Sequence, residues 1–534
     1  MNTNRFKIAT LNDIEDGQMQ IASAGEAKIL LARVEDQVYA TSLRCTHSGA
    51  ALTQGVLHEN RVVCPWHNAC FDLHTGEQTQ PLGLDNLASF PVEIQGEDIY
   101  VELPEPVPEQ QVPKMVTYNP DADKRTFVVL GAGAAGMTAV ETLRQQGFEG
   151  RIILISKETR LPYDRTKLSK KFLQGSASEN SLPKRSCEFY QEYGIELQFG
   201  QAVTKVDPAA RLVRLENGVE MNYDALLVAT GGAAVELDVP GSDLKNISKL
   251  RNFTDADELV EALEQAKRAV VVGSSFIGME VAASLSKQDL EVTVVSPDSV
   301  PFEDILGSEV GAMFQKLHEE NGVKFVLEAK ATEYKGNGKV EAVLADNGQE
   351  IPADLVVVGV GVKPVTYYLE GVELEDDQSI RADEYLQIQE GLYGAGDVVT
   401  FPLALTGEAT RIEHWRLAMQ HGRIAARNML GQQVKFCGIP FFWTGQFGNQ
   451  FRYAGHAESW DEVIIHGELN QQKFLAFYVK GDQILAVFGC NRDQDVAAIT
   501  ELMRCQKMPK AEVLKQADVD WIEKLKGKEL ISAS

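Results

Sequence analysis

The stretch that decides the fold of most of this chain is Phe127-Val128-Val129-Leu130-Gly131-Ala132-Gly133-Ala134-Ala135-Gly136. Its four apolar residues predict a buried strand, and residues 137–146 predict the helix that follows. A glycine pattern in this strand–turn–helix setting is the fingerprint of a dinucleotide site. The glycines permit a tight turn and close approach of the backbone, and the helix N-terminus faces the pyrophosphate. We therefore expect Gly131, Gly133, Ala135 and Gly136 to bind a dinucleotide.

The residue expected to bind the adenosine ribose of that dinucleotide is Glu158. It follows a second predicted strand, residues 152–155, and lies about 20 residues beyond the turn, where dinucleotide-binding domains place an acid. From Arg125 onward, strands alternate with helices, which is the pattern of a doubly wound parallel sheet.

A second fingerprint begins after the predicted strand at residues 269–272. It reads Gly273-Ser274-Ser275-Phe276-Ile277-Gly278, with Ser275 in place of the middle glycine. A serine is small enough to allow close approach of a dinucleotide, so we expect Gly273, Ser275 and Gly278 to line a second site. Ser296 stands where an NAD-specific site usually has an acid, and no basic residue follows to hold a 2′-phosphate. NADH is favoured on that ground, and NADPH stays open.

Two short loops carry the chain's most specific chemistry. They read Cys45-Thr46-His47 and, after sixteen residues, Cys64-Pro65-Trp66-His67. Each loop supplies one cysteine and one histidine, which suits a Rieske [2Fe–2S] centre with thiolates on one iron and imidazoles on the other. Zinc is the alternative for two cysteines and two histidines, but zinc fingers group the cysteines together and carry the histidines on a helix. We interpret Cys45, His47, Cys64 and His67 as cluster ligands.

Three further side chains lie near these loops in the sequence. We expect Cys70 to be a small buried thiol packed beside the cluster, and not a fifth ligand. We expect His58 and His74, which lack ligand spacing, to be surface or loop histidines.

Composition limits the partners and the compartment. The net charge of −26 argues against nucleic acid and anionic membranes as the main partners, because their phosphates would be repelled. No run of about 18 apolar residues predicts a membrane span. The N-terminus lacks the apolar stretch of a signal peptide, and seven cysteines in 534 residues do not form a disulfide framework. We therefore expect a cytoplasmic protein.

The pattern along the chain predicts a multidomain protein. Residues 1–105 predict an all-β domain of short strands, and the proline-rich residues 106–124 a semi-rigid linker. The first doubly wound domain is expected over residues 125–248 and 372–430, with the second inserted at 249–371. Residues 431–534 predict an α+β C-terminal domain, whose strand edges and apolar residues suggest a possible homodimer.

Two fingerprints with one domain inserted in the other resemble the two-dinucleotide flavoprotein reductases. Three further segments agree with that resemblance: residues 229–231 (Ala-Thr-Gly), 358–364 (Val-Gly-Val-Gly-Val-Lys-Pro) and 392–397 (Leu-Tyr-Gly-Ala-Gly-Asp). The resemblance implies that the first domain binds FAD and the second NAD(P)H. It also implies four strand-end positions and one aspartate, on the flavin ribityl chain, as cofactor-binding residues: Thr230, Gly231, Gly361, Gly396 and Asp397.

The subfamily is indicated by residues 161–170. Thiol-reducing members carry two cysteines there, whereas this chain reads Leu-Pro-Tyr-Asp-Arg-Thr-Lys-Leu-Ser-Lys and resembles oxygenase-coupled ferredoxin reductases and apoptosis-inducing-factor relatives. That resemblance implies that Arg165 and Lys170 reach the flavin, with Lys170 near its reactive edge. It places Glu280 at the nicotinamide–flavin contact. Trp415 and Trp443 match aromatic positions beside the flavin, although core packing explains them equally well.

The N-terminal domain resembles Rieske-type ferredoxins, and the whole order of domains resembles the Rieske-containing apoptosis-inducing-factor-like proteins. High-potential Rieske proteins brace the cluster with a disulfide, at positions held here by Ala50 and Trp66. Cys70 replaces the serine that donates to a cluster sulfur in those proteins. Fewer hydrogen bonds to the sulfurs predict a potential near the low end of the range of about −150 to +300 mV.

These features together predict an NAD(P)H-dependent oxidoreductase. Electrons would pass from NAD(P)H through FAD to the fused [2Fe–2S] cluster, and then to an unidentified oxygenase, cytochrome or soluble carrier. The alternative is a nicotinamide-responsive redox sensor or interaction protein of the apoptosis-inducing-factor type. A sensor should turn over slowly and hold its reduced flavin as a stable complex, whereas a reductase should cycle quickly.

Overall fold

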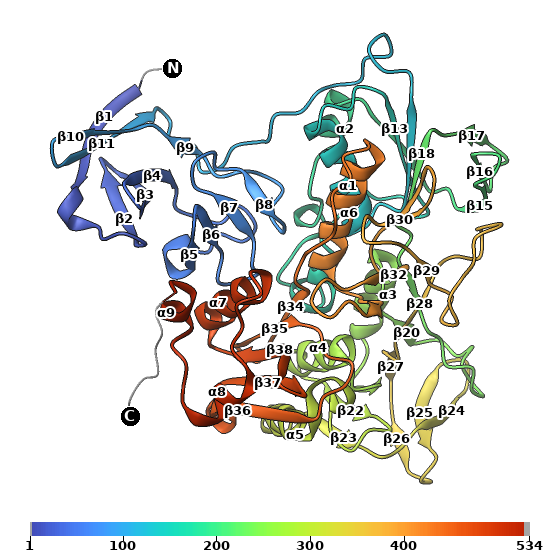
Figure 1. Ribbon diagram of the computed structural model, residues 1–534. Helices are drawn as coiled ribbons and strands as arrows, with labels where there is room; N and C mark the ends of the chain where they lie inside the picture. The colour runs from blue at the N-terminus through green and yellow to red at the C-terminus, as the bar shows by residue number, and fades with distance from the viewer. Residues whose placement is uncertain (1–2, 528–534) are drawn as a thin grey trace.

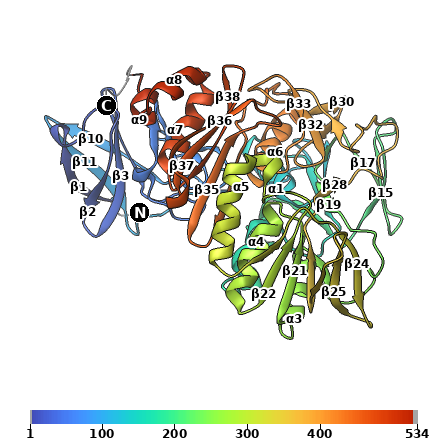
Figure 2. The same cartoon turned by 90° about the horizontal axis from the view of Figure 1, so that it is seen from below.

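The computed structural model, which describes residues 3–527, contains four structural units (Figure 1). One of the two doubly wound units is inserted in the sequence of the other. An N-terminal β domain, drawn in blue, lies beside the red C-terminal domain. Two doubly wound α/β domains lie on the other side of the molecule. The views of Figures 1 and 2 agree that the N-terminal strands lie next to helices α7 and α9 of the C-terminal domain.

The N-terminal domain is built from three small antiparallel sheets. Two of them, with strand orders β1-β11-β10 and β2-β3-β4-β9, enclose a core of residues such as Ile29, Leu31 and Val101. The third has the order β5-β6-β7-β8 and carries the second cysteine–histidine loop between β6 and β7. The strands are β1 (Thr3–Thr10), β2 (Met19–Ala24), β3 (Ala27–Val34), β4 (Gln37–Ser42), β5 (Val56–His58), β6 (Arg61–Val63), β7 (Cys70–Asp72), β8 (Gln78–Gln80), β9 (Ser89–Phe90), β10 (Val92–Gln95) and β11 (Asp98–Pro104).

The first doubly wound domain has a six-stranded sheet of order β14-β13-β12-β18-β31-β30, parallel except for the edge strand β30. Helices α1 and α6 pack against its apolar strands. The elements are β12 (Thr126–Leu130), α1 (Ala134–Gln145), β13 (Arg151–Ser156), α2 (Cys187–Glu192), β14 (Ile195–Phe199), β18 (Ala225–Val228), β30 (Gln387–Gln389), β31 (Leu392–Gly394) and α6 (Trp415–Met429). Two small sheets extend it: β15 (Val203–Asp207), β16 (Leu212–Leu215) and β17 (Glu220–Asn222), and β29 (Ile380–Arg381), β32 (Val399–Pro402) and β33 (Ala409–Thr410).

The second doubly wound domain has an all-parallel sheet of order β20-β27-β21-β22-β23. A two-stranded ladder, β19–β28, joins it to the first domain. Its elements are β19 (Gly232–Ala234), β20 (Ile247–Lys249), α3 (Phe253–Leu263), β21 (Arg268–Val272), α4 (Phe276–Leu285), β22 (Glu291–Val295), α5 (Glu303–Glu320), β23 (Lys324–Val326), β24 (Ala331–Gly336), β25 (Val340–Ala345), β26 (Glu350–Pro352), β27 (Leu355–Val358) and β28 (Val362–Pro364).

The C-terminal domain is a five-stranded antiparallel sheet of order β34-β35-β38-β37-β36 with three helices on it. The predicted strands at 463–466, 474–479 and 483–488 correspond to β36 (Glu462–Glu468), β37 (Lys473–Lys480) and β38 (Gln483–Cys490). The remaining elements are β34 (Phe441–Gln446), β35 (Asn449–Gly455), α7 (Asp493–Arg504), α8 (Ala511–Gln516) and α9 (Trp521–Leu525).

The N-terminal domain shares a core with its own reductase. Val56, Val63 and Cys70 of that domain belong to the same buried apolar cluster as Phe441 and Leu475 of the C-terminal sheet. The segment that joins the domains is also held in place. Gln111 exchanges two backbone hydrogen bonds of 2.9 Å with Asn86, and farther along the Val116 N–H donates to the Arg144 carbonyl. The expected extended linker is therefore bonded to the domains on either side.

Helices α1 and α6 approach each other so closely that one contact requires glycine. A Cβ added at Gly422 would lie 2.1 Å from the carbonyl oxygen of Ala135. Gly396, at the end of the sheet, faces Ala135 and Ala418 in the same region. Among the helices of residues 3–527, none is both long and apolar enough to span a membrane.

We expect Gly422→Ala to destabilise the first doubly wound domain by about 1–3 kcal/mol, because the added methyl group would force the two helices apart. Scanning calorimetry of the holoprotein would measure the loss as a lower unfolding temperature. Arg427→Ala is the control, because on the same helix it removes a bond to the exposed side chain of Gln432 and little else. Equal unfolding temperatures for the Gly422 variant and the wild type would contradict the close-packing argument.

Candidate cofactor sites

The two cysteine–histidine loops have the same backbone geometry. In the first, the Cys45 N–H donates to the Ala50 carbonyl at 2.9 Å, and the Gly49 N–H donates back to the Cys45 carbonyl at 2.9 Å. In the second, the Cys64 N–H donates to Ala69 at 2.8 Å, and Asn68 donates back to Cys64 at 3.1 Å. Gly49 and Asn68 occupy equivalent positions with φ of 77° and 59°, a left-handed conformation that glycine and asparagine adopt most easily. The loops are thus a matched pair.

The four expected ligands meet in two like pairs. The Nδ1 atoms of His47 and His67 lie 3.0 Å apart, and the Cys64 thiol hydrogen-bonds the Cys45 sulfur. Among the described residues, no three His, Cys, Asp or Glu side chains are arranged to hold a single metal ion. A zinc site would require all four ligands around one point, whereas a Rieske cluster places two thiolates on one iron and two imidazoles on the other. The donor set fits the [2Fe–2S] cluster.

Burial prepares these side chains to bind iron. Burial lowers the pKa of His47 to about 4 and lowers that of His67 further below its usual value, so both imidazoles are neutral near pH 7. The hydrogen bond between the two thiols lowers the pKa of Cys45 and raises that of Cys64. A metal centre takes up neutral imidazole and thiolate, so iron binding would be accompanied by loss of the thiol protons.

The surroundings of the second loop confirm one expectation and correct another. Cys70 is buried, and burial raises the pKa of its thiol, as expected of an inert packing cysteine. The expectation that His58 is a surface or loop histidine is wrong, because it is the last residue of strand β5 and its side chain is largely buried. Its side chain is 10% exposed, and its Nδ1 lies 3.7 Å from the buried carboxylate of Glu501 on α7. Sequence spacing gave no sign of this contact, because Glu501 belongs to another domain.

At the first fingerprint the structure leaves room for a pyrophosphate. A Cβ at Gly131 or Gly136 would collide with backbone oxygens, at 2.2 and 1.8 Å, so these glycines are required by packing. A Cβ at Gly133 would meet nothing within 4 Å, and no side chain caps the N-terminus of α1, which starts one residue later. Ala135 lies in the first turn of that helix. An open cradle of backbone N–H groups at a helix N-terminus fits a dinucleotide phosphate.

The expected ribose acid, Glu158, is held by two neighbours. The Tyr163 hydroxyl donates to its carboxylate at 2.7 Å, and the Arg165 guanidinium forms an ion pair with it. Arg165 also donates to the Arg251 carbonyl at 2.8 Å. The structure therefore brings Arg165 to Glu158 and not to Lys170.

The ends of three segments meet around Asp397. Arg251, which the sequence analysis missed, forms an ion pair of 2.7 Å with the Asp397 carboxylate and donates to the Gly232 carbonyl. A Cβ at Gly231 would lie 3.2 Å from that guanidinium. The Thr230 hydroxyl is turned away from this group and donates to the Val365 carbonyl at 2.8 Å. In this position the Arg251 guanidinium could bind a phosphate, and the Asp397 carboxylate could accept hydrogen bonds from the hydroxyl groups of a ribityl chain.

The second fingerprint repeats the design of the first and adds one acid. A Cβ at Gly273 or Gly278 would lie 2.4 or 2.3 Å from a backbone oxygen, whereas one at Gly361 would meet open space. The Ser275 hydroxyl donates to the Gly359 carbonyl at 2.9 Å.

An aspartate two positions beyond Ser296 reaches the site where the strand-end acid was missing. The Asp298 carboxylate accepts hydrogen bonds of 2.9 Å from both Ser274 and Ser296, at the carboxyl ends of β21 and β22. Asp298 carries no strand-end signal in the sequence, because it follows Pro297 and lies outside the strand. The turn, and not the strand register, brings its carboxylate back.

Glu280 joins three domains at one carboxylate. Its two oxygens accept from the Lys170 ammonium at 2.7 Å, the Ser169 hydroxyl at 2.5 Å and the Thr444 hydroxyl at 2.7 Å. Lys170 lies in a short π-helical turn, Leu168–Phe172, a conformation frequent at functional sites. The structure thus brings Lys170 and Glu280 together, and it adds Thr444, which had no sequence signal.

Trp443 contacts the cluster ligands directly. Its ring centroid lies 4.5 Å from that of His67 and 6.1 Å from that of His47. Trp443 precedes Thr444 on β34, so one strand connects the cluster histidines to the carboxylate of Glu280. Trp415 begins α6 and packs against the core of the first doubly wound domain.

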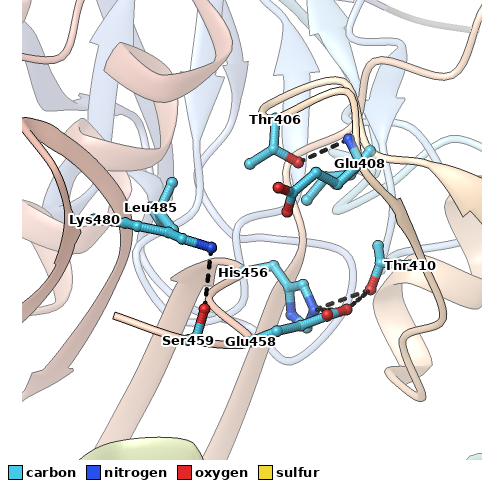
Figure 3. Close-up of a pocket in the computed structure, with 9 residues that line it drawn as sticks. Thr406, Glu408, Thr410, His456, Glu458, Ser459, Lys480 and Leu485 are labelled. Atoms are coloured by element: carbon cyan, nitrogen blue, oxygen red, sulfur yellow. Dashed lines mark hydrogen bonds and ion pairs between the residues drawn. The ribbon is translucent and has the colours of Figure 1, made fainter. Parts of the chain in front are cut away.

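A small polar cavity lies elsewhere, between the β32–β33 hairpin and the part of the C-terminal domain formed by the β35–β36 connection and the β37–β38 hairpin (Figure 3). Its polar groups bind one another: Thr410 hydrogen-bonds both His456 and Glu458, and Lys480 hydrogen-bonds Ser459. None of the predicted cofactor residues lines it.

Three known protein families match three successive segments of the chain, and these segments contain the sites described above. The model described as pyridine nucleotide-disulphide oxidoreductase matches residues 125–422. The chain belongs to that family. A Rieske [2Fe-2S] domain matches residues 4–91, and a reductase C-terminal domain matches residues 441–524. The predicted multidomain fold and the Rieske-containing flavoprotein class are therefore confirmed.

Individual relatives match most of the chain. Apoptosis-inducing factor 3 of Homo sapiens is 38% identical over 507 residues, which are 93% of this chain and 83% of the human protein. The benzene 1,2-dioxygenase system ferredoxin–NAD(+) reductase subunit of Pseudomonas putida is 32% identical, over 73% of this chain and 95% of its own. The covalent putidaredoxin reductase–putidaredoxin complex aligns with a TM-score of 0.71 and 29% identity, over 76% of this chain and 98% of that one.

This protein is accordingly a ferredoxin-reductase-like NAD(P)H oxidoreductase with a fused Rieske domain, and its family fold implies FAD, a nicotinamide and a [2Fe–2S] cluster. The open cradle at Gly133 and the charged pair Arg251–Asp397 fit FAD. The open space at Gly361 and the carboxylate of Asp298 at the second fingerprint fit a nicotinamide dinucleotide, and the paired Cys and His side chains fit the cluster.

We expect Cys64→Ser to abolish cluster binding, because it removes one of the two thiolates for the same iron. Iron and acid-labile sulfide content, together with the visible spectrum of the purified protein, would measure the loss. Cys70→Ser is the control: it changes a buried thiol six residues away and should leave the cluster content unchanged. Full cluster content in the Cys64 variant would show that the ligand set is wrong.

Proposed function

We propose that this oxidoreductase passes electrons from NADH by way of FAD to its own [2Fe–2S] cluster, and on to a separate acceptor. The observation that carries the proposal is the contact of Trp443 with both cluster histidines, next to Thr444, which binds Glu280. The cluster ligands and the Lys170–Glu280 pair thus belong to one continuous set of contacts.

FAD supplies the junction chemistry, because a flavin takes two electrons from a nicotinamide and can release them singly. By family resemblance, Lys170 lies at the reactive edge of the flavin, where a cation stabilises anionic charge. Glu280 fixes the ammonium of Lys170 at 2.7 Å and is itself fixed by Ser169 and Thr444. We assign Lys170 and Glu280 as the catalytic pair.

The residues proposed to hold each group follow from their positions. Cys45, His47, Cys64 and His67 would hold the cluster. The residues proposed for FAD are Gly131, Gly133, Ala135, Gly136, Glu158, Arg165, Lys170, Thr230, Gly231, Gly396, Asp397, Trp415 and Trp443, with Arg251 added from the structure. Gly273, Ser275, Gly278, Glu280 and Gly361 would line the nicotinamide site. Of these, Thr230 is the weakest assignment, because its hydroxyl binds Val365.

The acceptor is proposed from chemistry and from relatives. One relative serves a benzene dioxygenase system and another structure holds putidaredoxin, so an oxygenase, a cytochrome or a soluble carrier suits this chain. The N-terminal domain packs on its own reductase, so the proposal does not need the homodimer suggested by the sequence. The homodimer and the cytoplasmic location stay predictions.

We expect an anaerobic titration with NADH to bleach the flavin absorbance first and then produce the EPR signal of a reduced Rieske cluster.

Trp443→Ala should slow cluster reduction about tenfold or more while leaving flavin reduction near its normal rate, because it removes the packing that orients the histidines. Stopped-flow absorbance would measure both rates. Trp460→Ala is the control, since Trp460 packs on Tyr478 and not on the cluster histidines.

A reduced flavin beside an oxidised cluster would overturn the proposed path. It would favour the nicotinamide-responsive sensor, in which the reduced flavin persists as a stable complex and turnover is slow.

The preference for NADH rests on Asp298. Its carboxylate is fixed by Ser274 and Ser296 at the end of the second strand of the nicotinamide domain. An acid in this place binds a ribose 2′-hydroxyl in NAD-specific sites and would repel a 2′-phosphate.

We expect Asp298→Asn to lower the ratio of NAD⁺ to NADP⁺ affinity about tenfold, because like-charge contacts at a binding site cost on the order of a few kcal/mol. Calorimetric titration of the oxidised protein with each nucleotide would measure the ratio without turnover. Asp289→Asn, an exposed acid after α4, should leave the ratio unchanged. An unchanged ratio in the Asp298 variant would place the specificity elsewhere.

A further inference from the structure

The backbone of the second cluster loop is bound by two arginines of the reductase. Arg416, on α6, donates to the Asn68 carbonyl at 2.9 Å, and Arg452, on β35, donates to the Pro65 and Trp66 carbonyls at 3.1 and 2.9 Å. These three carbonyls flank the ligand His67 on both sides. Arg416 also donates to the Pro81 and Ile439 carbonyls, which joins the loop to the neighbouring turn and to the start of the C-terminal domain.

Both guanidinium groups are withdrawn from water. Arg416 is 2% exposed and Arg452 is 3% exposed. Within the described part of the chain, Arg416 makes no ion pair, and its hydrogen bonds go to carbonyl oxygens. Arg452 has one counter-ion, Asp493 at the start of α7, at 2.5 Å. The carboxylate that acts on the charge of Arg416 is that of Glu501, which also pairs with His58, Arg61 and Arg504.

A guanidinium keeps its proton even under these conditions. Burial lowers the pKa of Arg416 to about 10, which leaves it charged near pH 7. Arg452 binds the carbonyls of Pro65 and Trp66, the two residues between Cys64 and His67. Placing positive charges in a low-dielectric interior is costly, and buried charges in proteins are therefore usually paired with an opposite charge or hydrogen-bonded to dipoles. Three of the five carbonyls that accept hydrogen bonds from the two guanidiniums, those of Pro65, Trp66 and Asn68, belong to the second cysteine–histidine loop.

We propose that Arg416 and Arg452 are positioning residues of the reductase that raise the reduction potential of the docked cluster. One-electron reduction adds one negative charge to the cluster. No bond is made or broken, and no proton is transferred. Two fixed cations behind the ligand loop stabilise that added charge more than they stabilise the oxidised form. The missing hydrogen bonds to the cluster sulfurs lower the reduction potential, and the two cations of the reductase offset part of that decrease.

This inference rests on the proposed function only in requiring the bound cluster. The test is therefore a potentiometric titration of the full-length holoprotein with redox mediators, in which EPR follows the cluster. Mediators reduce the cluster directly, so the result does not depend on whether NADH or the flavin can deliver electrons.

The ion pair gives two variants with opposite expected signs. Arg452→Gln removes a cation and should shift the cluster's reduction equilibrium about tenfold toward the oxidised form, which is 59 mV lower for one electron. Asp493→Asn removes the counter-charge of Arg452 and should raise the potential. Arg452→Lys keeps the charge and should stay near the wild-type value. A structural loosening of the loop would not reverse sign between the first two variants.

Two control variants change charged residues near the domain interface but do not touch the second cysteine–histidine loop. Arg423→Gln removes a hydrogen bond of 2.9 Å from α6 to the Gln78 carbonyl, on the same face of the N-terminal domain, and should not change the potential. Asp495→Asn removes an acid in the same turn as Asp493 that pairs with Arg492, and should likewise have no effect. Arg416→Gln should lower the potential as Arg452→Gln does.

Two outcomes would overturn the proposal. One is an unchanged potential in Arg452→Gln, and the other is a shift in the same direction for Arg452→Gln and Asp493→Asn. If Arg416→Gln fails to retain its cluster, the opposed Arg452 and Asp493 variants decide the question by themselves.

Discussion

The buried contact between the cluster-binding loop and the reductase is the constraint on which the rest of this structure depends. Guanidinium groups taken out of water must find acceptors, and the loop carbonyls taken out of water must find donors. Arg416 and Arg452 satisfy both needs with the same bonds. Because these bonds are directional, they fix which edge of the N-terminal domain faces the reductase. That edge carries His47 and His67, and their rings consequently meet Trp443.

A second junction ties the remaining domains to this contact. Glu280 comes from the nicotinamide domain, Ser169 and Lys170 from the flavin domain, and Thr444 from the C-terminal domain. A carboxylate with three donors from two other domains cannot move without leaving one of them unpaired. The position of the lysine proposed to face the flavin is thus set by residues distant from it in sequence. The cluster and the Lys170–Glu280 pair are adjacent because β34 serves both.

How far the sequence predicts this arrangement depends on the range of each interaction. The fingerprints and the cysteine–histidine loops are local motifs, so the two dinucleotide domains and the Rieske domain follow from spacing alone. Arg251, Asp298, Thr444, Arg416 and Arg452 escape prediction, because each acts on a group from another segment or domain. His58 was wrongly expected at the surface for the same reason: its partner, Glu501, lies on α7. Charged side chains that fold inward carry no periodic signal, since their burial is decided by tertiary contacts.

The segment between the N-terminal and flavin domains has a kinetic consequence. Because this segment joins the two domains covalently, they stay in one molecule at any dilution, and its hydrogen bonds with Asn86 and Arg144 hold it against both. The proposed electron transfer between them would then be a first-order event, whose rate is the same in a cell with few copies and in a concentrated extract. A separate ferredoxin must instead find its reductase by diffusion, at a rate that falls with concentration and with salt. In the fused chain, only the encounter with the separate electron acceptor would depend on concentration and salt.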